Sequence, residues 1–219
     1  FNYPKKDVEI NYEPVDILYE DTFLIVAFKP PFLLVHDDGN NQDTLQARIN
    51  GYLQLNGNKY PAQAIHRIDY ETSGLVLFCK HPFFQAYCDK NMEEHHIKKE
   101  YIALVQGHTN YKNKKIISNI ARDRHNAKKM IIHPNGKESI SIFNTIKNYK
   151  DCSLIQVTIL TGRKHQIRVQ CASLNHPILN DSLYGGKMTD DTGLLLQSHH
   201  IQFNDVDITC PQEKRFIRK

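Results

Sequence analysis

The chain has 219 residues, 40% of them hydrophobic, and a formal net charge of +4 at neutral pH. This length is enough to bury a real core, in one large domain or two small ones. No apolar run approaches the length of a membrane span, and the N-terminal residues do not form a signal peptide. The cysteine number is odd and no Cys-x-x-Cys pair occurs, which predicts reduced thiols in a cytoplasmic protein.

In chain order, hydrophobic patterning predicts a series of strands separated by a few helices. Strands are expected over residues 15–19, 23–29, 75–78, 99–106, 116–120, 128–133, 139–146, 154–160, 194–197 and 199–203. Helices are expected from Asp43-Thr44 to about residue 56, over residues 83–97, and from Lys164 to about residue 175. Because strands outnumber helices and tight turns join several of them, we predict an α+β fold with a mixed, largely antiparallel sheet and flanking helices.

The charge is spread unevenly along the chain. Residues 7–21 contain acidic side chains but no Lys or Arg, whereas residues 112–137 contain Asp123 as their only acid. The basic residues of that second segment are Lys112, Lys114, Lys115, Arg122, Arg124, Lys128, Lys129 and Lys137. Such a segment suits a polyanion such as RNA, although a solvated surface loop explains it equally well.

A stretch at residues 64–80 places Asp69 between an arginine, Arg67, and a Thr-Ser-Gly turn. The apolar run that follows reads as a buried strand, so Asp69 stands in a turn at the end of a strand. A rigid scaffold commonly presents a reactive group at such a place. The alternative is an ordinary turn in which the Asp side chain pairs with nearby backbone amides.

Two further stretches carry candidate functional side chains. Arg163 and Lys164 stand at the start of a helix, and Arg168 lies about one turn further, beside an apolar stripe. An arginine near a core needs a carboxylate partner, and Asp69 would suit; a solvated basic helix is the alternative. Tyr101 lies on an alternating strand, where it is either a core aromatic or a platform for a nucleobase.

Several other chemistries are not indicated. Adjacent histidine pairs occur at 95–96 and 199–200, but neighbouring side chains diverge on a strand or helix and rarely bind one ion. No His-Glu-x-x-His, Gly-rich nucleotide loop or Gly-x-Ser-x-Gly motif is present. We therefore expect neither a metal nor a cofactor.

Taken together, these stretches resemble the RluA family of pseudouridine synthases. The matching motifs are His-Arg-Leu-Asp-x-x-Thr-Ser-Gly at 66–74, Lys-x-Tyr-x-Ala at 99–103, Thr-Gly-Arg-x-His-Gln-Ile-Arg at 161–168, and His-Pro-Ile-x-Gly-Asp followed by Tyr-Gly at 176–185. Ile68 replaces the usual Leu, and Asn180 replaces the usual Gly before Asp181, which questions the shape of that loop.

The resemblance implies an enzyme that isomerises uridine in ribosomal RNA, in tRNA or in both, within a stem-loop. It implies that Asp69 is the catalytic carboxylate, that Arg168 pairs with it, and that Tyr101 packs against the target base. Arg67 resembles the residue that fills the space left by that base in a relative. The expected RNA-binding residues are His66, Arg67, Thr72, Arg163, Lys164, His165, Lys128 and Lys129.

The likeness extends from about residue 15 to about residue 211. We expect residues 1–219 to form a single catalytic domain without an S4-type RNA-binding domain, acting as a cytoplasmic monomer away from membranes. One alternative is an RNA-binding or ribosome-assembly module on the same scaffold. Another is an Asp-dependent glycosidic hydrolase, which usually needs a second carboxylate, and Glu71 is the only nearby candidate. The target RNA and the modified uridine are left open.

Overall fold

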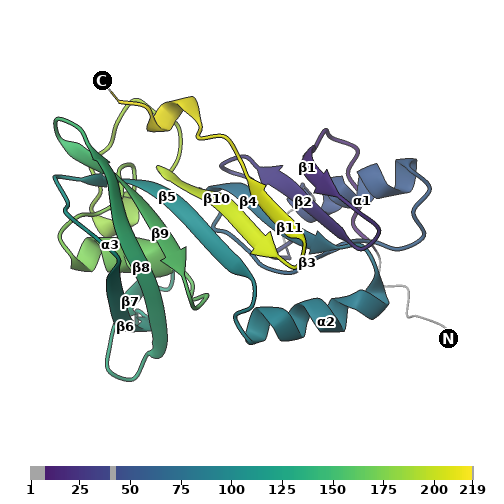
Figure 1. Ribbon diagram of the computed structural model, residues 1–219, viewed down its shortest axis with the longest axis horizontal. Helices are drawn as coiled ribbons and strands as arrows, with labels where there is room; N and C mark the ends of the chain where they lie inside the picture. The colour runs from purple at the N-terminus through teal and green to yellow at the C-terminus, as the bar shows by residue number, and fades with distance from the viewer. Residues whose placement is uncertain (1–7, 40–42, 219) are drawn as a thin grey trace. The chain divides into compact units, whose positions relative to one another are not determined.

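The computed structural model describes residues 8–39 and 43–218, and the chain divides into two compact units. Unit 1 comprises residues 1–96 and unit 2 comprises residues 97–219. Strands dominate both units and helices flank them (Figure 1), which confirms the predicted α+β class. The single-domain organisation stays a prediction. Among the helices in the described ranges, none is long and apolar enough to cross a membrane.

Unit 1 is built on a short antiparallel sheet. Its strands run in the order β1 (Asp16–Glu20), β2 (Leu24–Lys29) and β4 (Ser73–Cys79), with β3 (Gln63–Ala64) paired to β4. Every residue of β4 is buried, as its apolar run predicts. Helix α1 (Leu45–Leu55) packs Leu45, Ile49 and Leu53 into a core shared with β2 and β4. Helix α2 (Pro82–Glu93) follows β4 along the chain.

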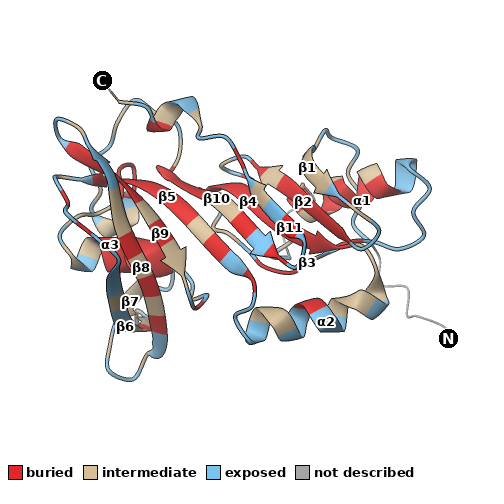
Figure 2. Ribbon diagram, viewed as in Figure 1, coloured by how far each residue is buried: buried red, intermediate tan, exposed pale blue. Residues whose placement is uncertain are grey.

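Unit 2 holds a longer antiparallel sheet. Its order is β10 (Leu196–Phe203), β5 (Lys98–Gln106), β9 (Cys152–Ile159), β8 (Lys137–Asn148), β6 (Lys114–Arg122) and β7 (Met130–Ile132), with β11 (Val206–Thr209) paired to β10. Helix α3 (Gln166–Ser173) contacts β6 and β7, and two short 3₁₀ helices are η1 (Ser182–Tyr184) and η2 (Lys214–Phe216). The middle of β5 is buried, whereas β8 is exposed at both ends (Figure 2).

Local chemistry sets the helix boundaries. Helix α1 begins as predicted, because the Thr44 hydroxyl accepts a hydrogen bond of 3.0 Å from the Ala47 amide. Helix α2 ends at Glu93 instead of the predicted residue 97. His95 adopts a left-handed conformation with φ of 61°, which an α-helix cannot accommodate.

The last strands also differ from the prediction. Instead of two strands at 194–197 and 199–203, a single strand β10 runs through a bulge at His199, where its register with β5 shifts. Strand β11 was not predicted. It forms a hairpin with β10 through a turn at Asn204, whose φ of 52° is the left-handed conformation that such turns require.

Gly51 in the middle of α1 shows how closely the chain packs in unit 1. The Asn11 amide donates to the Ala47 carbonyl over 2.9 Å, so an extended segment crosses the helix surface. A Cβ atom added at Gly51 would lie only 2.1 Å from the Asn11 carbonyl oxygen. A glycine is therefore required here for close backbone approach.

We expect Gly51→Ala to lower the free energy of unfolding by about 1–3 kcal/mol, because the backbone must shift to admit the methyl group. This loss outweighs the preference of about 1 kcal/mol that alanine has over glycine in a helix. Urea unfolding measures the change. The control is Leu55→Ala at a position 73% exposed, which should change stability by less than about 0.5 kcal/mol. A more stable Gly51→Ala protein would contradict the close-packing explanation.

Candidate functional site

The turn that carries Asp69 lies between β3 and β4 in unit 1. The Ile65 amide donates to the Leu77 carbonyl over 2.9 Å, and the Thr72 amide donates to the Asp69 carbonyl over 3.1 Å. The chain therefore reverses tightly and returns as the buried strand β4. The sequence predicts Asp69 in a turn at or near the end of a strand; the turn is found, but β3 ends at Ala64, five residues before Asp69.

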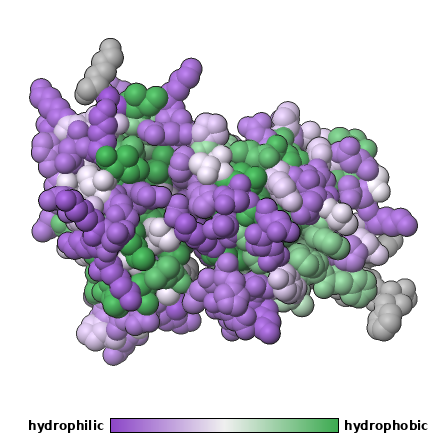
Figure 3. Space-filling view, in the orientation of Figure 1, coloured by the Kyte–Doolittle hydropathy of each residue, from purple (hydrophilic) through white to green (hydrophobic). Residues whose placement is uncertain are grey.

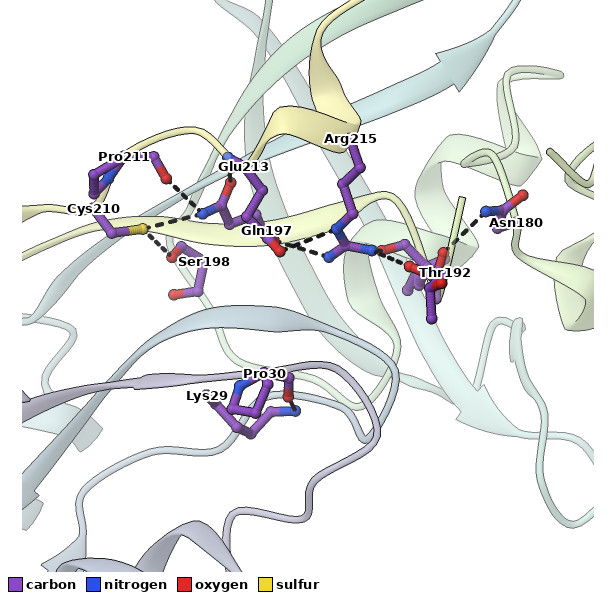
Figure 4. Close-up of polar contacts among 12 residues, drawn as sticks. Lys29, Pro30, Asn180, Thr192, Gln197, Ser198, Cys210, Pro211, Glu213 and Arg215 are labelled. Atoms are coloured by element: carbon purple, nitrogen blue, oxygen red, sulfur yellow. Dashed lines mark hydrogen bonds and ion pairs between the residues drawn. The ribbon is translucent and has the colours of Figure 1, made fainter. Parts of the chain in front are cut away.

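A buried lysine, Lys29, supports this turn from β2. It is fully buried, and its ammonium donates to the carbonyl oxygens of Pro30 over 2.8 Å, drawn in Figure 4, and of Tyr70 over 3.1 Å. The Phe32 amide donates to the same Tyr70 carbonyl over 2.8 Å. The peptide next to Asp69 is thus held in place by a charged donor. Lys29 was not assigned a role from the sequence. The pattern that indicates one is a lysine at the end of an apolar strand.

The residues predicted to contact RNA in unit 1 lie in different environments. His66 is buried, and its Nε2 accepts from the Leu77 amide over 3.2 Å. Thr72 is also buried, and its hydroxyl has no hydrogen-bond partner among the described residues. Both residues therefore build the turn. Arg67 is exposed to solvent, where it can meet a large ligand.

Arg67 also has a neighbour of its own. Its Nη1 lies 3.2 Å from His36 Nε2, and because a guanidinium only donates, the imidazole nitrogen accepts. Burial lowers the pKa of His36, and the positive charge of Arg67 lowers it further. A neutral His36 thus orients an exposed arginine beside the Asp69 turn.

Strand β5 of unit 2 places Lys99 and Tyr101 on one face, because alternate residues of a strand share a side. Both side chains are buried, at 4% and 6% exposure. Tyr101 is paired with Val157 of β9 and Ser198 of β10. Burial lowers the pKa of Lys99 to about 8. Strand β5 therefore carries a desolvated amine two residues from the predicted base-stacking tyrosine.

Arg168 lies in α3 with 3% of its surface exposed. Its Nε donates to Asp181 Oδ2 and its Nη2 donates to Asp181 Oδ1, each over 2.8 Å. The sequence predicts a carboxylate partner for this arginine, and within unit 2 that partner is Asp181. The pairing of Arg168 with Asp69 stays a prediction. Asp181 was missed as a functional residue although it belongs to the fourth motif.

The turn before α3 is built by a buried amide side chain that sequence reasoning also missed. Gln166 Oε1 accepts from the Thr161 hydroxyl and the Arg163 amide, each over 3.0 Å. Its Nε2 donates to the Ile140 carbonyl over 3.1 Å. Because His165 has a φ of 55°, the helix begins at Gln166 instead of the predicted Lys164. The motif glutamine thus anchors α3 to β8.

The loop that carries Asp181 contains a left-handed residue, Asn180. Asn180 has a φ of 65°, a conformation that favours glycine and that asparagine tolerates best among the other residues. Its side chain also accepts from the Thr189 amide over 2.6 Å and donates to the Gly193 carbonyl over 3.1 Å. The asparagine thus adopts a backbone conformation that favours glycine and also bonds to the loop that follows.

The basic residues predicted to bind RNA in unit 2 fall into two groups. Arg163 is partly engaged, since its Nε donates to the Glu138 carbonyl over 2.9 Å. His165 Nδ1 lies 2.9 Å from the Tyr184 hydroxyl, and Lys129 Nζ lies 5.5 Å from the Tyr184 ring centroid. Lys164 and Lys128 are exposed.

A hollow of about 340 Å³ is lined by residues between 121 and 135, at the end of β6. Its lining includes Arg122, Arg124, His125 and His133. Hydrophilic side chains also cover much of the face that Figure 3 shows over unit 2. The hollow is thus lined by more basic than acidic side chains, with Asp123 as the acid among its lining residues.

Metal ions need a group of ligand side chains held close together. Over residues 8–39 and 43–218, no group of three or more His, Cys, Asp or Glu side chains is arranged to hold an ion.

Comparison with known proteins finds similarity over most of the chain. The family model described as RNA pseudouridylate synthase matches residues 23–173. An uncharacterised RNA pseudouridine synthase of Bacillus subtilis is 36% identical over 178 residues, which are 80% of this chain and 59% of that protein. Ribosomal large subunit pseudouridine synthase D of Borreliella burgdorferi is 31% identical over 214 residues, which are 93% of this chain and 64% of that protein. The chain thus spans less than two thirds of the length of these two relatives.

Two solved human structures share the fold. Human RNA pseudouridylate synthase domain containing 1 has a TM-score of 0.78 at 23% identity, covering 92% of this chain and 85% of that one. Human RNA pseudouridylate synthase domain containing 4 has a TM-score of 0.76 at 20% identity, covering 92% of this chain and 90% of that one.

The lowered pKa of Lys99 predicts a pH dependence of stability. The unfolded chain keeps this proton up to about its ordinary pKa of 10.5, whereas the folded protein releases it above about 8. The free energy of unfolding should therefore rise between these pH values by about 3 kcal/mol from this group, and the group adds no slope below pH 8.

Urea unfolding between pH 7 and 10.5 tests this expectation, with Lys99→Met as the comparison. Methionine has a similar length and no charge, so the variant should lack this part of the rise. Parallel curves for the two proteins would show that Lys99 titrates as an ordinary lysine.

Proposed function

This chain belongs to the RNA pseudouridylate synthase family, and we propose on that basis that it converts uridine to pseudouridine in RNA. The RluA resemblance of its motifs is confirmed by this family match and by the ribosomal pseudouridine synthase among its relatives. The observation that carries the proposal is the motif aspartate, Asp69, in a hydrogen-bonded turn backed by a fully buried strand. A turn held in this way limits the positions that the Asp69 carboxylate can take.

The proposed chemistry needs one carboxylate and no cofactor. The C1′–N1 bond breaks, the uracil turns, and a C1′–C5 bond forms; C5 loses its proton to solvent and N1 takes one up. Asp69 attacks the sugar as a nucleophile or assists loss of the C2′ proton. We propose that Tyr101 packs against the base and that Arg168 pairs with Asp69 to keep it ionised. The target uridine must leave its stack to react. We propose that Arg67, which is exposed, fills the space that the uridine leaves.

We propose a structured RNA as the substrate, with a stem-loop as the recognised element. The exposed basic segment and its hollow support phosphate contacts along such an element. The name of the Borreliella relative favours ribosomal RNA as the first target to test, with tRNA as the second. We also propose a cytoplasmic monomer, and the five buried free cysteines are consistent with a reducing compartment.

Two rivals predict different products. A non-catalytic RNA-binding module would bind the RNA and leave its uridines unchanged. A glycosidic hydrolase would release free uracil, and it would need a second carboxylate such as Glu71. Mapping pseudouridines at single-nucleotide resolution in total RNA, from cells with and without the gene, distinguishes all three and identifies the target.

We expect Asp69→Asn to abolish pseudouridine formation, a loss of at least about 10³-fold, because the amide is neither a nucleophile nor a base. RNA binding and the unfolding transition should stay close to those of the unchanged protein. The measurement is pseudouridine content after incubation with ribosomal RNA and tRNA transcripts. Turnover of the variant near the original rate would remove Asp69 from the mechanism.

We expect the Lys128→Ala, Lys129→Ala double variant to bind RNA more weakly and with a shallower salt dependence. Each phosphate contact that is lost should lower the slope of log K against log salt by about 1. The rate on saturating RNA should be spared. The matched control replaces Lys59 and Lys90, exposed lysines of unit 1 outside the basic segment. An unchanged slope in the Lys128, Lys129 variant would place the RNA elsewhere.

A further inference from the structure

Two residues without an assigned role, Asp181 and Tyr184, hold the guanidinium of Arg168. We propose that both are positioning residues, which fix the direction in which the other N–H groups of Arg168 point during the reaction. This inference rests on the proposed function, because Arg168 has a chemical task only if the site isomerises uridine.

Asp181 is built into a rigid loop. It is fully buried, and its carboxylate binds the guanidinium with two parallel bonds of 2.8 Å. Its backbone carbonyl accepts from the amides of Tyr184 over 3.2 Å and Gly186 over 2.8 Å. A Cβ atom at Gly186 would lie 1.9 Å from the Ile178 carbonyl oxygen, so only glycine lets the loop close. These contacts restrain the backbone that carries the carboxylate.

Tyr184 bounds the same guanidinium with its ring. The guanidinium carbon of Arg168 lies 5.2 Å from the ring centroid, within the range of a cation–π contact. The Tyr184 hydroxyl accepts from the Met130 amide over 2.8 Å and can donate to His165 Nδ1 over 2.9 Å. These bonds tie the ring to β7 and to the start of α3. The ring is thus held by hydrogen bonds at its hydroxyl as well as by its attachment to the backbone.

The consequence is directional. A guanidinium is planar and has five N–H groups. When Nε and Nη2 are bound to one carboxylate and a ring limits rotation, the plane of the guanidinium is set, and so are the directions of its other N–H bonds. The carboxylate also balances the charge, so Arg168 acts as an aimed donor and less as a bare cation.

Stability alone is a weak reason for this arrangement. Hydrophobic residues of similar volume often stabilise a buried site as well as an ion pair does. A fixed donor direction is the property that a hydrophobic pair cannot supply. A positioning role therefore predicts an effect on the rate that depends on the presence of Arg168.

The test is a double-mutant cycle of Asp181→Asn and Arg168→Lys. The probes are ribosomal RNA and tRNA transcripts that carry tritium at C5 of uridine, because the isomerisation releases that tritium to water. We expect Asp181→Asn to lower the single-turnover rate at saturating enzyme by about tenfold or more, with the Kd for RNA within about threefold. In the Arg168→Lys background, Asp181→Asn should lower the rate by less than about threefold further. An unchanged rate, or losses that multiply, would overturn the positioning role.

Asp43→Asn is the control for an ion pair of the same two-bond geometry, at a site where the carboxylate side chain is 44% exposed instead of fully buried. Asp43 binds Arg48 through Nε over 2.8 Å and Nη2 over 2.7 Å, the same two-bond geometry at the start of α1 in unit 1. This control should keep the full rate. If it loses as much rate as Asp181→Asn, the loss reflects a broken ion pair in general and the proposal fails.

Tyr184→Phe carries the test if Asp181→Asn does not fold, as judged by circular dichroism. It keeps the ring and removes only the hydroxyl bonds, so the rate should fall about threefold to tenfold, again only when Arg168 is present. A full rate in Tyr184→Phe contradicts the role of the tyrosine. An unchanged protein that releases no tritium from either RNA contradicts the proposed function itself, whereas an active protein with fully active Asp181 variants contradicts only the positioning role.

Discussion

The desolvation of charged groups shapes both units of this protein. In unit 2 the guanidinium of Arg168 and the carboxylate of Asp181 are both almost completely removed from water. Each would be costly to bury alone, and together they require two parallel bonds within a narrow range of geometry. The left-handed Asn180, the close approach at Gly186 and the tethered Tyr184 ring are the backbone and side-chain features that meet this requirement.

Unit 1 meets the same constraint with a different solution. The buried ammonium of Lys29 is bound by main-chain carbonyls, one of which belongs to Tyr70, beside Asp69. A turn on a surface would normally be mobile, since loops make few buried contacts. Here the buried ammonium of Lys29 and the Phe32 amide both donate to the Tyr70 carbonyl, and the turn continues into the buried strand β4. The buried ammonium needs carbonyl partners, and because one of them is the Tyr70 carbonyl, the backbone next to Asp69 is restrained.

A helix or strand was predicted correctly where the residues that cause it are close together in the sequence. The apolar run of β4, the Thr44 cap of α1 and the alternation of β5 are signals contained in a few neighbouring residues. The end of α2 at Glu93 was missed because it depends on the left-handed backbone of His95. The prediction split strand β10 in two. Its bulge at His199 is defined by the pairing register with β5, which residues 194–203 alone do not specify.

The sequence alone determined the family, the α+β class and the segments that bear Asp69, Tyr101 and Arg168, because motif spacing and short-range periodicity are properties of the chain itself. It could not assign partners to those residues. The tertiary structure decided that Asp181 binds Arg168, that Gln166 anchors the start of α3 and that Lys29 supports the Asp69 turn. Lys29 bonds across 41 positions to Tyr70, and Gln166 across 26 positions to Ile140. Such contacts form only when buried polar groups that are far apart in the chain must satisfy one another in a folded interior.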